Sequence, residues 1–264
     1  METLLHSEIL KKYKEETNEY IKKKNVEKLF DIILKNVLIN KPDNIYLYIY
    51  NNIYSFLLNK IFIMGPPVLK ITSMLSSHIS ESFNYYHISL PMLIQQYKLN
   101  KGESSNNKII VNDEIISFIL KENINNLDSK KKKGYIVEGY PNNNLQAYNC
   151  LKYLPSHVFV LYADEEYIYK KYEEENDIVI FSYTQKKDYD INESYEINDM
   201  DVKPLKDQVL SYIRNISDML TILGTNKKVL NLQDFNDQML IDHVKNEVSK
   251  NKDEWDSTLN GDII

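Results

Sequence analysis

The sequence contains one cysteine, six glycines and a single arginine among its 264 residues. Because Cys150 has no second cysteine to pair with, no disulfide bond can form within the chain, which fits a reducing compartment. The longest apolar runs fall well short of the roughly 18 residues that a membrane-spanning helix needs. The first residues, METLLHSEILKKYKEE, are too polar for a signal peptide. We therefore expect a cytoplasmic protein with no membrane partner.

An excess of positive charge is also lacking. The formal net charge is −6 at pH 7, so no global positive field attracts nucleic acid, and we expect no nucleic-acid partner. The densest basic run, residues 130–133, lies beside Asn-rich sequence and is expected to be a solvated loop. Hydrophobic residues make up 43% of the chain and charged residues 27%, which is typical of a soluble globular protein.

Residue patterns for two common kinds of hydrolytic chemistry are missing as well. The five histidines are scattered along the chain without metal-ligand spacing. No serine stands in a nucleophile-elbow pattern. We therefore expect neither a metal-dependent hydrolase nor a catalytic triad.

From residue 58 onward, short apolar runs alternate with longer amphipathic stretches. The apolar runs predict strands at 60–64, 85–88, 134–138, 157–162 and 228–232. The amphipathic stretches predict helices near 70–83, 90–99, 112–122, 143–152, 164–175, 205–223 and 235–250. Strands separated by helical crossovers predict an α/β fold, with a mostly parallel sheet covered by helices on both faces.

Three segments depart from this alternation. Residues 1–57 contain no glycine and are predicted to be helical, with a break at KPDN (41–44), where Asp43 or Asn44 can cap the next helix. Residues 176–204 are long and acidic for a connection, with a short strand expected at Ile178–Ser182, and a lid and a mobile surface loop are the alternatives for this insert. The polar tail, 251–264, is expected to be loose.

The stretch IFIMGPPVLKIT (61–72) contains part of a phosphate-binding loop. A predicted strand leads into Gly65, and Lys70 and Thr72 follow, as such a loop requires. However, the loop has only one glycine, and Lys70 comes one position earlier than the pattern Gly-x-x-x-x-Gly-Lys places it. A triphosphate-binding loop and an ordinary strand–helix turn are therefore the two alternatives.

Five segments, in order along the chain, resemble adenylate kinases and the wider family of nucleoside monophosphate kinases. Three of them are GPPVLKIT (65–72) against the family's GxPGSGKGT, HISLPML (87–93) against its ISTGDLL, and GYIVEGYPNNNLQA (134–147) against its GWILDGFPRTxxQA. The other two are KIIVNDEIISFIL (108–120), which is similar to GxLVPDEIVxxLV, and VFVLYADEEYIYKKY (158–172), which has the form of the family's next strand and helix. The resemblance spans about residues 58–250, and it implies a P-loop NTPase-type α/β core with a lid insert.

This resemblance also implies which residues would form the site. The implied nucleotide contacts are Gly65, Pro67, Lys70, Thr72, Ser89, Gly139 and Gln146. If the protein were active, Lys70 would serve catalysis, Mg²⁺ would be held through Thr72 and Glu138, and ATP would be the other cofactor. If it is inactive, no cofactor is implied. Ser89 has a second interpretation as a helix cap, and Gln146 has one as a surface residue.

The arginines that the resemblance implies are missing. Asn142 stands at the position of one, and Gln95 and Gln96 occupy the neighbourhood of another. Our alignment places Tyr212 at a third position, which leaves Arg214 off the site. A single arginine can be worth roughly 10³–10⁵ in the rate of phosphoryl transfer, and lysine does not reproduce its bidentate geometry. We therefore expect nucleotide binding to be doubtful and turnover to be small.

Three functions follow as hypotheses. The first is an adenylate kinase-like protein that is catalytically impaired and acts as a scaffold or assembly component. The second is an active nucleoside monophosphate kinase that converts ATP and AMP to ADP, with Lys70, Lys170 and Lys171 in place of the arginines. The third is a sensor that binds one nucleotide without turning it over.

Before the kinase-like part, the segment NVEKLFDIILKNVLINKPDNIYLYIYNNI (25–53) resembles the docking and dimerisation motif of protein kinase A regulatory subunits. Similar segments precede some ciliary adenylate kinases, which adds the ciliary or flagellar axoneme as an alternative location. A helix pair of this size buries too little apolar surface to be stable alone. We expect residues 25–56 to dimerise or to receive a partner protein's helix, with packing on the kinase-like domain as the alternative.

Overall fold

A computed structural model describes residues 2–103, 109–176 and 199–259. The chain divides into two compact units. One comprises Asn59–His243, and the other comprises Met1–Leu58 together with Val244–Ile264. The strand expected at Ile178–Ser182, within the acidic insert, lies outside the described residues.

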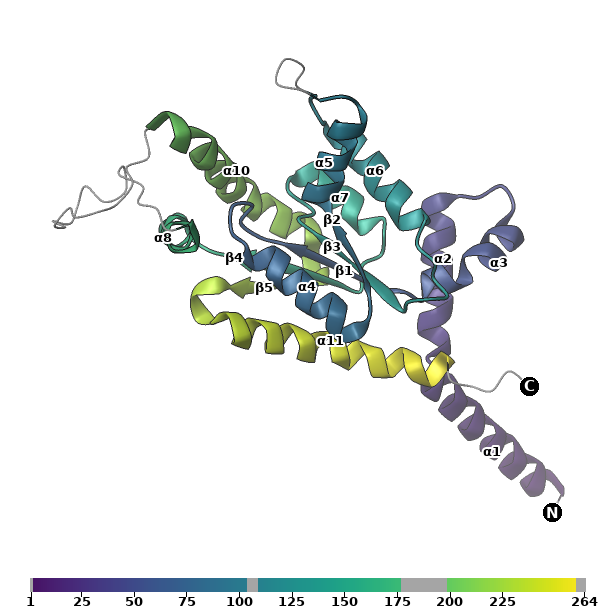
Figure 1. The fold of residues 1–264 in the computed structure, drawn as a ribbon. Helices are drawn as coiled ribbons and strands as arrows, with labels where there is room; N and C mark the ends of the chain where they lie inside the picture. Colours follow the sequence, from purple (N-terminus) through teal and green to yellow (C-terminus); the bar gives the residue numbers. More distant parts are fainter. Residues whose placement is uncertain (1, 104–108, 177–198, 260–264) are drawn as a thin grey trace. The chain divides into compact units, whose positions relative to one another are not determined.

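The larger unit is built on a five-stranded parallel sheet (Figure 1). Its strands are β1 (Asn59–Met64), β2 (Tyr86–Ser89), β3 (Gly134–Glu138), β4 (His157–Tyr162) and β5 (Lys227–Asn231), in the order β2-β3-β1-β4-β5. All five predicted strands are therefore confirmed, with ends that differ by one residue at most. Every residue of β1 and of β3 is buried, as expected for strands that are covered on both faces.

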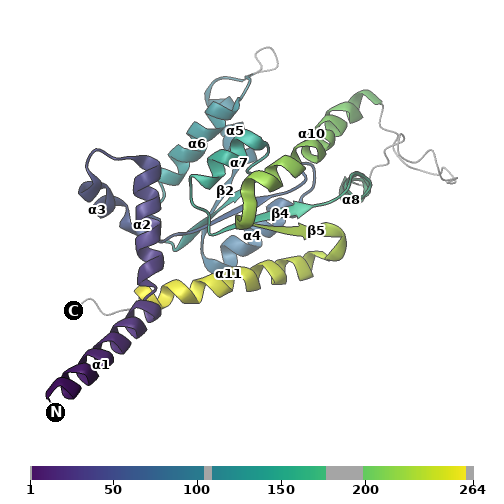
Figure 2. The same cartoon turned by 180° about the vertical axis from the view of Figure 1, so that it is seen from behind.

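Helices connect the strands and cover the sheet. They are α4 (Ile71–Phe83), α5 (Leu90–Asn100), α6 (Asp113–Asn125), α7 (Asn144–Leu151), α8 (Glu165–Asn176) and α10 (Asp199–Leu223), with short 3₁₀ turns at Gly224–Asn226 and Leu232–Asp234. The two views show α4 on one face of the sheet and α7 and α10 on the opposite face (Figures 1 and 2). The predicted α/β architecture, a P-loop NTPase-like sheet between two helical layers, is confirmed.

Asparagine side chains fix where several helices begin. Asn112 accepts a hydrogen bond from the backbone N–H of Ile115 at the start of α6. Asn143 accepts one from the N–H of Gln146 at the start of α7. Each satisfies a backbone donor that has no partner within its helix. The Asn-rich composition therefore supplies helix caps as well as loops.

The smaller unit begins with three helices: α1 (Glu2–Lys23), α2 (Val26–Asn40) and α3 (Ile45–Phe56). The KPDN turn separates α2 from α3, and the side chain of Asn44 caps α3 by accepting from the N–H of Leu47. Of the two predicted caps, Asn44 is the one that forms. Among the described residues, no helix is both long enough and apolar enough to cross a membrane.

The last helix, α11, spans Asp237–Leu259. It continues past residue 250, where the pattern predicts its end, so the predicted end of this helix is wrong. Polar composition misled that prediction. Residues 251–259 contain no glycine or proline, and the first helix breaker is Gly261.

Lys60, in β1, is a buried lysine. It is only 8% exposed, and its Nζ donates to the backbone carbonyl of Tyr153 at 3.1 Å. Burial lowers the pKa of Lys60 to about 8. Because the unfolded chain holds this proton more tightly, the charged lysine destabilises the fold below pH 8, and the penalty declines as the pH rises toward the unfolded pKa.

We therefore expect Lys60→Met to raise the free energy of unfolding at pH 7 by about 1–2 kcal/mol, after allowing for the lost bond to Tyr153. The gain over wild type should shrink between pH 8 and pH 10. Urea unfolding at a series of pH values measures the free energy of unfolding of both proteins. The titration of all other groups is common to both, so it cancels when one value is subtracted from the other. Lys121→Met, at an exposed lysine of α6, is the control. A pH-independent difference for Lys60→Met would contradict the prediction.

Candidate functional site

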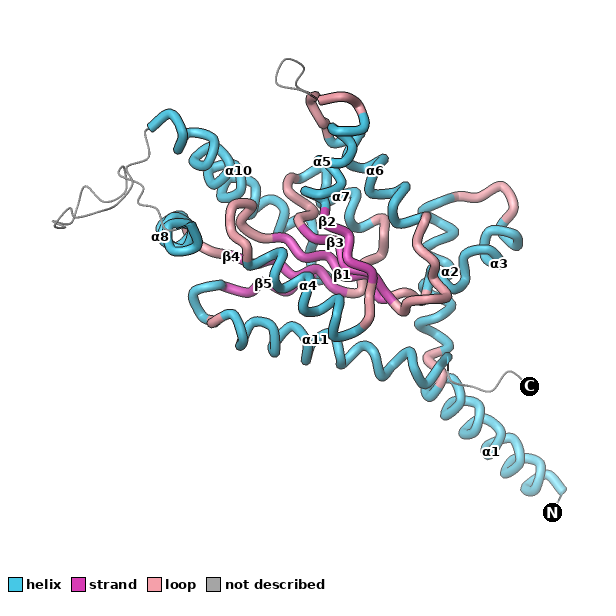
Figure 3. The backbone as a smooth tube through the Cα atoms, viewed as in Figure 1, coloured by secondary structure: helices cyan, strands magenta, loops and turns pink. Residues whose placement is uncertain are grey.

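The residues implied by the adenylate kinase resemblance converge at the carboxyl ends of β1 and β3, the edge where parallel sheets bind ligands. Loops leave the sheet there in Figure 3. A cavity of about 110 Å³ lies at this edge, lined by Gly65, Pro66, Pro67, Leu69, Thr72, Ser73, Leu90, Pro91, Ile94, Glu138, Gly139 and Asn142. Pockets for drug-sized ligands are usually about 300–1,000 Å³, so the free space is small for a nucleotide.

The predicted site residues divide into two groups around this cavity. Those that line it are Gly65, Pro67, Thr72, Glu138 and Gly139. Lys70, Ser89 and Gln146 are not among the lining residues. Ser89 ends β2 and pairs in register with Glu138. It occupies the N-cap position of α5 but makes no side-chain cap bond.

The loop between β1 and α4 has few backbone donors to offer a phosphate. Pro66 and Pro67 carry no N–H group. The N–H of Leu69 donates to the carbonyl of Pro66 at 3.2 Å, and the N–H of Lys70 donates to Glu175 at 3.0 Å. Phosphate-binding loops work through several inward-pointing N–H groups. The geometry therefore favours the strand–helix turn over the triphosphate-binding loop.

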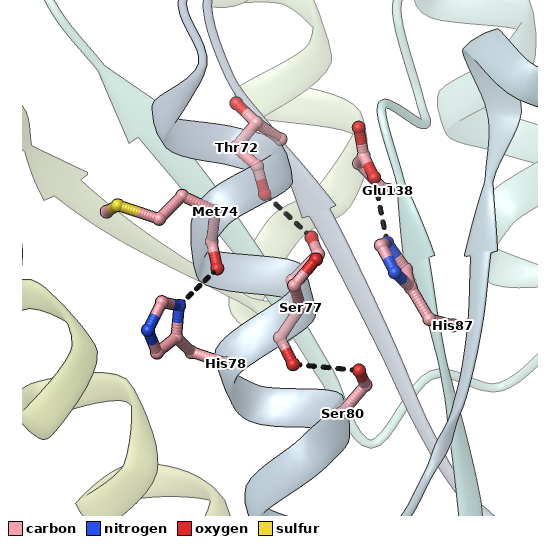
Figure 4. Close-up of polar contacts among 8 residues, drawn as sticks. Thr72, Met74, Ser77, His78, Ser80, His87 and Glu138 are labelled. Carbon is pink, nitrogen blue, oxygen red and sulfur yellow. Dashed lines mark hydrogen bonds and ion pairs between the residues drawn. The ribbon is translucent and has the colours of Figure 1, made fainter.

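Gly65 is required here for close packing. A β-carbon at this position would lie 2.6 Å from Oγ1 of Thr72, which is too short for a real contact, and 3.0 Å from Cβ of Leu161, which is very tight. The hydroxyl of Thr72 is buried without a hydrogen-bond partner among the described residues. The glycine of the motif thus packs against Thr72, which lies in the first turn of α4 (Figure 4).

Lys70 is bonded away from the cavity. Its Nζ donates to the backbone carbonyl of Glu175 at 2.9 Å, while its backbone N–H donates to the Glu175 carboxylate. Glu175 belongs to the last turn of α8. The lysine that would meet a phosphate is therefore engaged by a residue 105 positions further along the chain.

Glu138, at the position of the family's metal-associated aspartate, is paired with a histidine. Its Oε2 lies 2.8 Å from Nε2 of His87, as Figure 4 shows. The sequence did not predict His87 as a site residue, because its spacing along the chain matches no ligand pattern. The pairing of the strands is the signal that places it beside Glu138. His87 pairs with Ile136 across the β2–β3 ladder, so Glu138, two residues on, projects from the same face of the sheet.

The residues offer limited means to hold Mg²⁺. Thr72 and Glu138 both line the cavity, and a carboxylate with a hydroxyl is an oxygen donor set that suits Mg²⁺ when phosphates supply the remaining ligands. One Glu138 oxygen is already paired with His87. Among the described residues, no group of three or more histidine, cysteine, aspartate or glutamate side chains could hold a metal ion.

Gln146, implied to read the nucleotide base, is committed to the fold. It is 3% exposed, so its interpretation as a surface residue is wrong. Its Nε2 donates to Oδ1 of Asp113 at 2.7 Å, and its Oε1 accepts from the N–H of Asn142 at 2.8 Å. Asp113 also accepts from Nδ2 of Asn143. These contacts join the start of α6 to the start of α7.

We expect Gln146→Ala to lower the free energy of unfolding by roughly 2 kcal/mol, because the part-buried carboxylate of Asp113 and the backbone N–H of Asn142 both lose a partner. Chemical denaturation measures the loss. The matched control is Gln208→Ala, at an exposed position of α10, which should change stability by less than about 0.5 kcal/mol. Equal stability of the two variants would show that Gln146 has no structural role.

The positions that resemble arginine sites hold side chains that face other partners. Nδ2 of Asn142 donates back to the carbonyl of Gly139 at 2.7 Å. Tyr212 is buried, and its hydroxyl donates to the carbonyl of Leu161 at 2.6 Å. Arg214 is exposed on α10. None of these three side chains brings to the cavity, as far as the chain is described, a cation that would stabilise a transferring phosphoryl group.

In the described part of the chain, no lysine lines the cavity in place of those arginines. Lys170 is exposed on α8, and Lys171 is 3.9 Å from Glu174 on the same helix. Neither lines the cavity beside Glu138. Among the described residues, those that line the cavity include Gly65, Thr72 and Glu138 of the motifs but no lysine or arginine.

Comparisons with known proteins agree with this geometry. A family model described as the N-terminal domain of inactive adenylate kinase matches residues 1–57. A protein of Plasmodium falciparum (isolate 3D7) named "Inactive adenylate kinase" is 96% identical over 263 residues, which cover 100% of both chains. The resemblance to a degenerate adenylate kinase is confirmed. The chain belongs to the family of inactive adenylate kinases, as an adenylate kinase-like protein whose catalysis is impaired.

Proposed function

We propose that the protein is a non-catalytic assembly component that dimerises through its N-terminal helices. The observation that carries this proposal is a pair of exposed apolar stripes, called here the N-terminal stripes. One consists of Phe30, Leu34 and Leu38 on α2, and the other consists of Tyr46, Tyr50 and Tyr54 on α3, all at least half exposed. Exposed apolar groups of this kind mark interaction surfaces.

The spacing of each stripe makes it a continuous helical surface. Its three residues are separated by four positions, so they lie above one another along the helix. The rings of Tyr46 and Tyr50 stack with centroids 6.5 Å apart. Large side chains held in this way lose little further entropy when a partner covers them.

A second copy of the chain is the occupant that we favour. Helices α2 and α3 pack on each other, and so short a pair gains little stability from its own contacts. In a two-fold dimer, the same surface of both copies meets itself, so four helices bury four stripes at once, as in a helical bundle. A single amphipathic helix from another protein would cover fewer of them and is the alternative partner.

Sedimentation velocity of the full chain over a range of concentrations tests this proposal. We expect a concentration-dependent dimer. A chain that stays monomeric at every concentration would contradict self-association. The amphipathic helix of another protein would then remain as the partner of the N-terminal stripes. We place the assembly role in the cytoplasm, and the resemblance of residues 25–53 to docking motifs adds the ciliary axoneme as the alternative location.

A nucleotide sensor is the second candidate function, and the hydroxyl of Thr72 favours it. This group is buried at the cavity without a partner among the described residues, and with Glu138 it could take Mg²⁺ and ATP. Thermal shifts with ATP, AMP and a bisubstrate dinucleotide test this function. A shift without turnover supports the sensor, whereas no shift with any of them leaves the assembly role.

A further inference from the structure

We propose that Glu175 acts as an internal anion that closes the former phosphate loop. Its carboxylate accepts a hydrogen bond from the backbone N–H of Lys70, and its backbone carbonyl accepts one from Nζ of the same lysine. One glutamate thus occupies two donors that the phosphate loop would offer a nucleotide.

The start of α4 explains why an anion is stabilised there. Lys70 is the N-cap residue of α4, it makes no side-chain cap bond, and the first turn of the helix contains no acidic residue. The backbone N–H groups at the start of the helix and the helix dipole therefore attract negative charge. In contrast, α6 begins with a capping asparagine and carries Asp113 and Glu114 in its first turn. Glu175, from α8, supplies to α4 what α6 has within its own sequence.

The bond between Lys70 and the Glu175 carbonyl strengthens this closure. Because it involves the backbone at the end of α8, it holds that helix end against the loop as well as the side chain. A phosphate that approaches Lys70 meets the Glu175 carboxylate and must displace it. Two features therefore act against phosphate binding: the loop has only one glycine, and Glu175 competes for the remaining donors.

The test is the affinity of the full chain for inorganic pyrophosphate, measured by titration calorimetry. We expect Glu175→Ala to bind at least tenfold more tightly than wild type, because the competing carboxylate is gone. Adding Lys70→Ala to that variant should abolish the gain. The matched control is Glu174→Gln, which removes the neighbouring charge of α8 and should bind as wild type does.

Hydrogen exchange gives a second readout that needs no ligand. The amide of Lys70 should exchange faster in Glu175→Ala than in wild type, while the amides in the middle of α4 stay unchanged. Glu175→Gln, which keeps the size of the side chain and removes its charge, replaces the alanine variant if that one fails to fold. The proposal is overturned if neither variant gains pyrophosphate affinity, or if Glu174→Gln gains as much.

Discussion

Full-length protein mixed with ATP, AMP and Mg²⁺ is expected to form ADP at no more than about 10⁻⁴ of the 1–100 s⁻¹ that is typical of kinases. Phosphoryl transfer depends on positioned cations, and each missing arginine can cost roughly 10³ or more in rate. Asn142 donates back to its own loop, and Tyr212 donates to a buried carbonyl. Neither of these positions supplies a cation.

A coupled assay for ADP, run beside an active adenylate kinase, measures this rate. Lys70→Ala is the control for the origin of any remaining activity. A residual rate that arises from a contaminating kinase does not depend on Lys70, so it will be the same in this variant. A rate of tens per second would contradict the assignment of impaired catalysis, whereas a small residual rate that disappears with Lys70 would show that the remaining activity belongs to the protein.

The second large effect is expected at the N-terminal stripes. Phe30→Glu should raise the dimer dissociation constant by at least about 100-fold, because a carboxylate would have to leave water to enter an apolar interface. Phe30 is 65% exposed, so the substitution should leave the fold of one chain intact. Circular dichroism checks that fold, and sedimentation measures the constant.

Phe118→Glu is a closely matched control. Phe118 lies on α6, in the other unit, and is 64% exposed, so the side chain, its exposure and the charge change are the same. We expect this variant to dimerise as wild type does. If both variants weaken the dimer equally, the charge change acts generally, and the proposed interface is wrong.

The sequence predicted the sheet well because burial on both faces leaves a strong local pattern. In the fully buried strand β1 the apolar run 61–64 leads into Gly65, and in β3 the apolar run 135–137 is followed by Glu138 and then Gly139. The resemblance then placed both glycines at one edge, where they line a single cavity. Helix ends were predicted less well, as α11 shows, because polar sequence without a breaker is compatible with a helix or a coil.

The partners of the site residues could not be predicted in the same way. The contact between Lys70 and Glu175 joins residues 105 positions apart, and that between Gln146 and Asp113 joins residues 33 apart. No local pattern encodes such pairs, because they depend on how the helices meet in space. His87 and Glu138 are an intermediate case. Their pairing follows from alternation along adjacent strands, but only after the strand order is known.

The buried amide of Gln146 has a consequence for how such proteins change over generations. Both polar atoms of that side chain are bonded to the chain itself, so purifying selection on foldability alone suffices to retain the glutamine after the enzyme has lost its substrate. Positions of this type will drift more slowly than positions that served only the chemistry, such as the one now held by Asn142. Counting the motif letters that survive in a relative therefore overestimates how recently it was an enzyme.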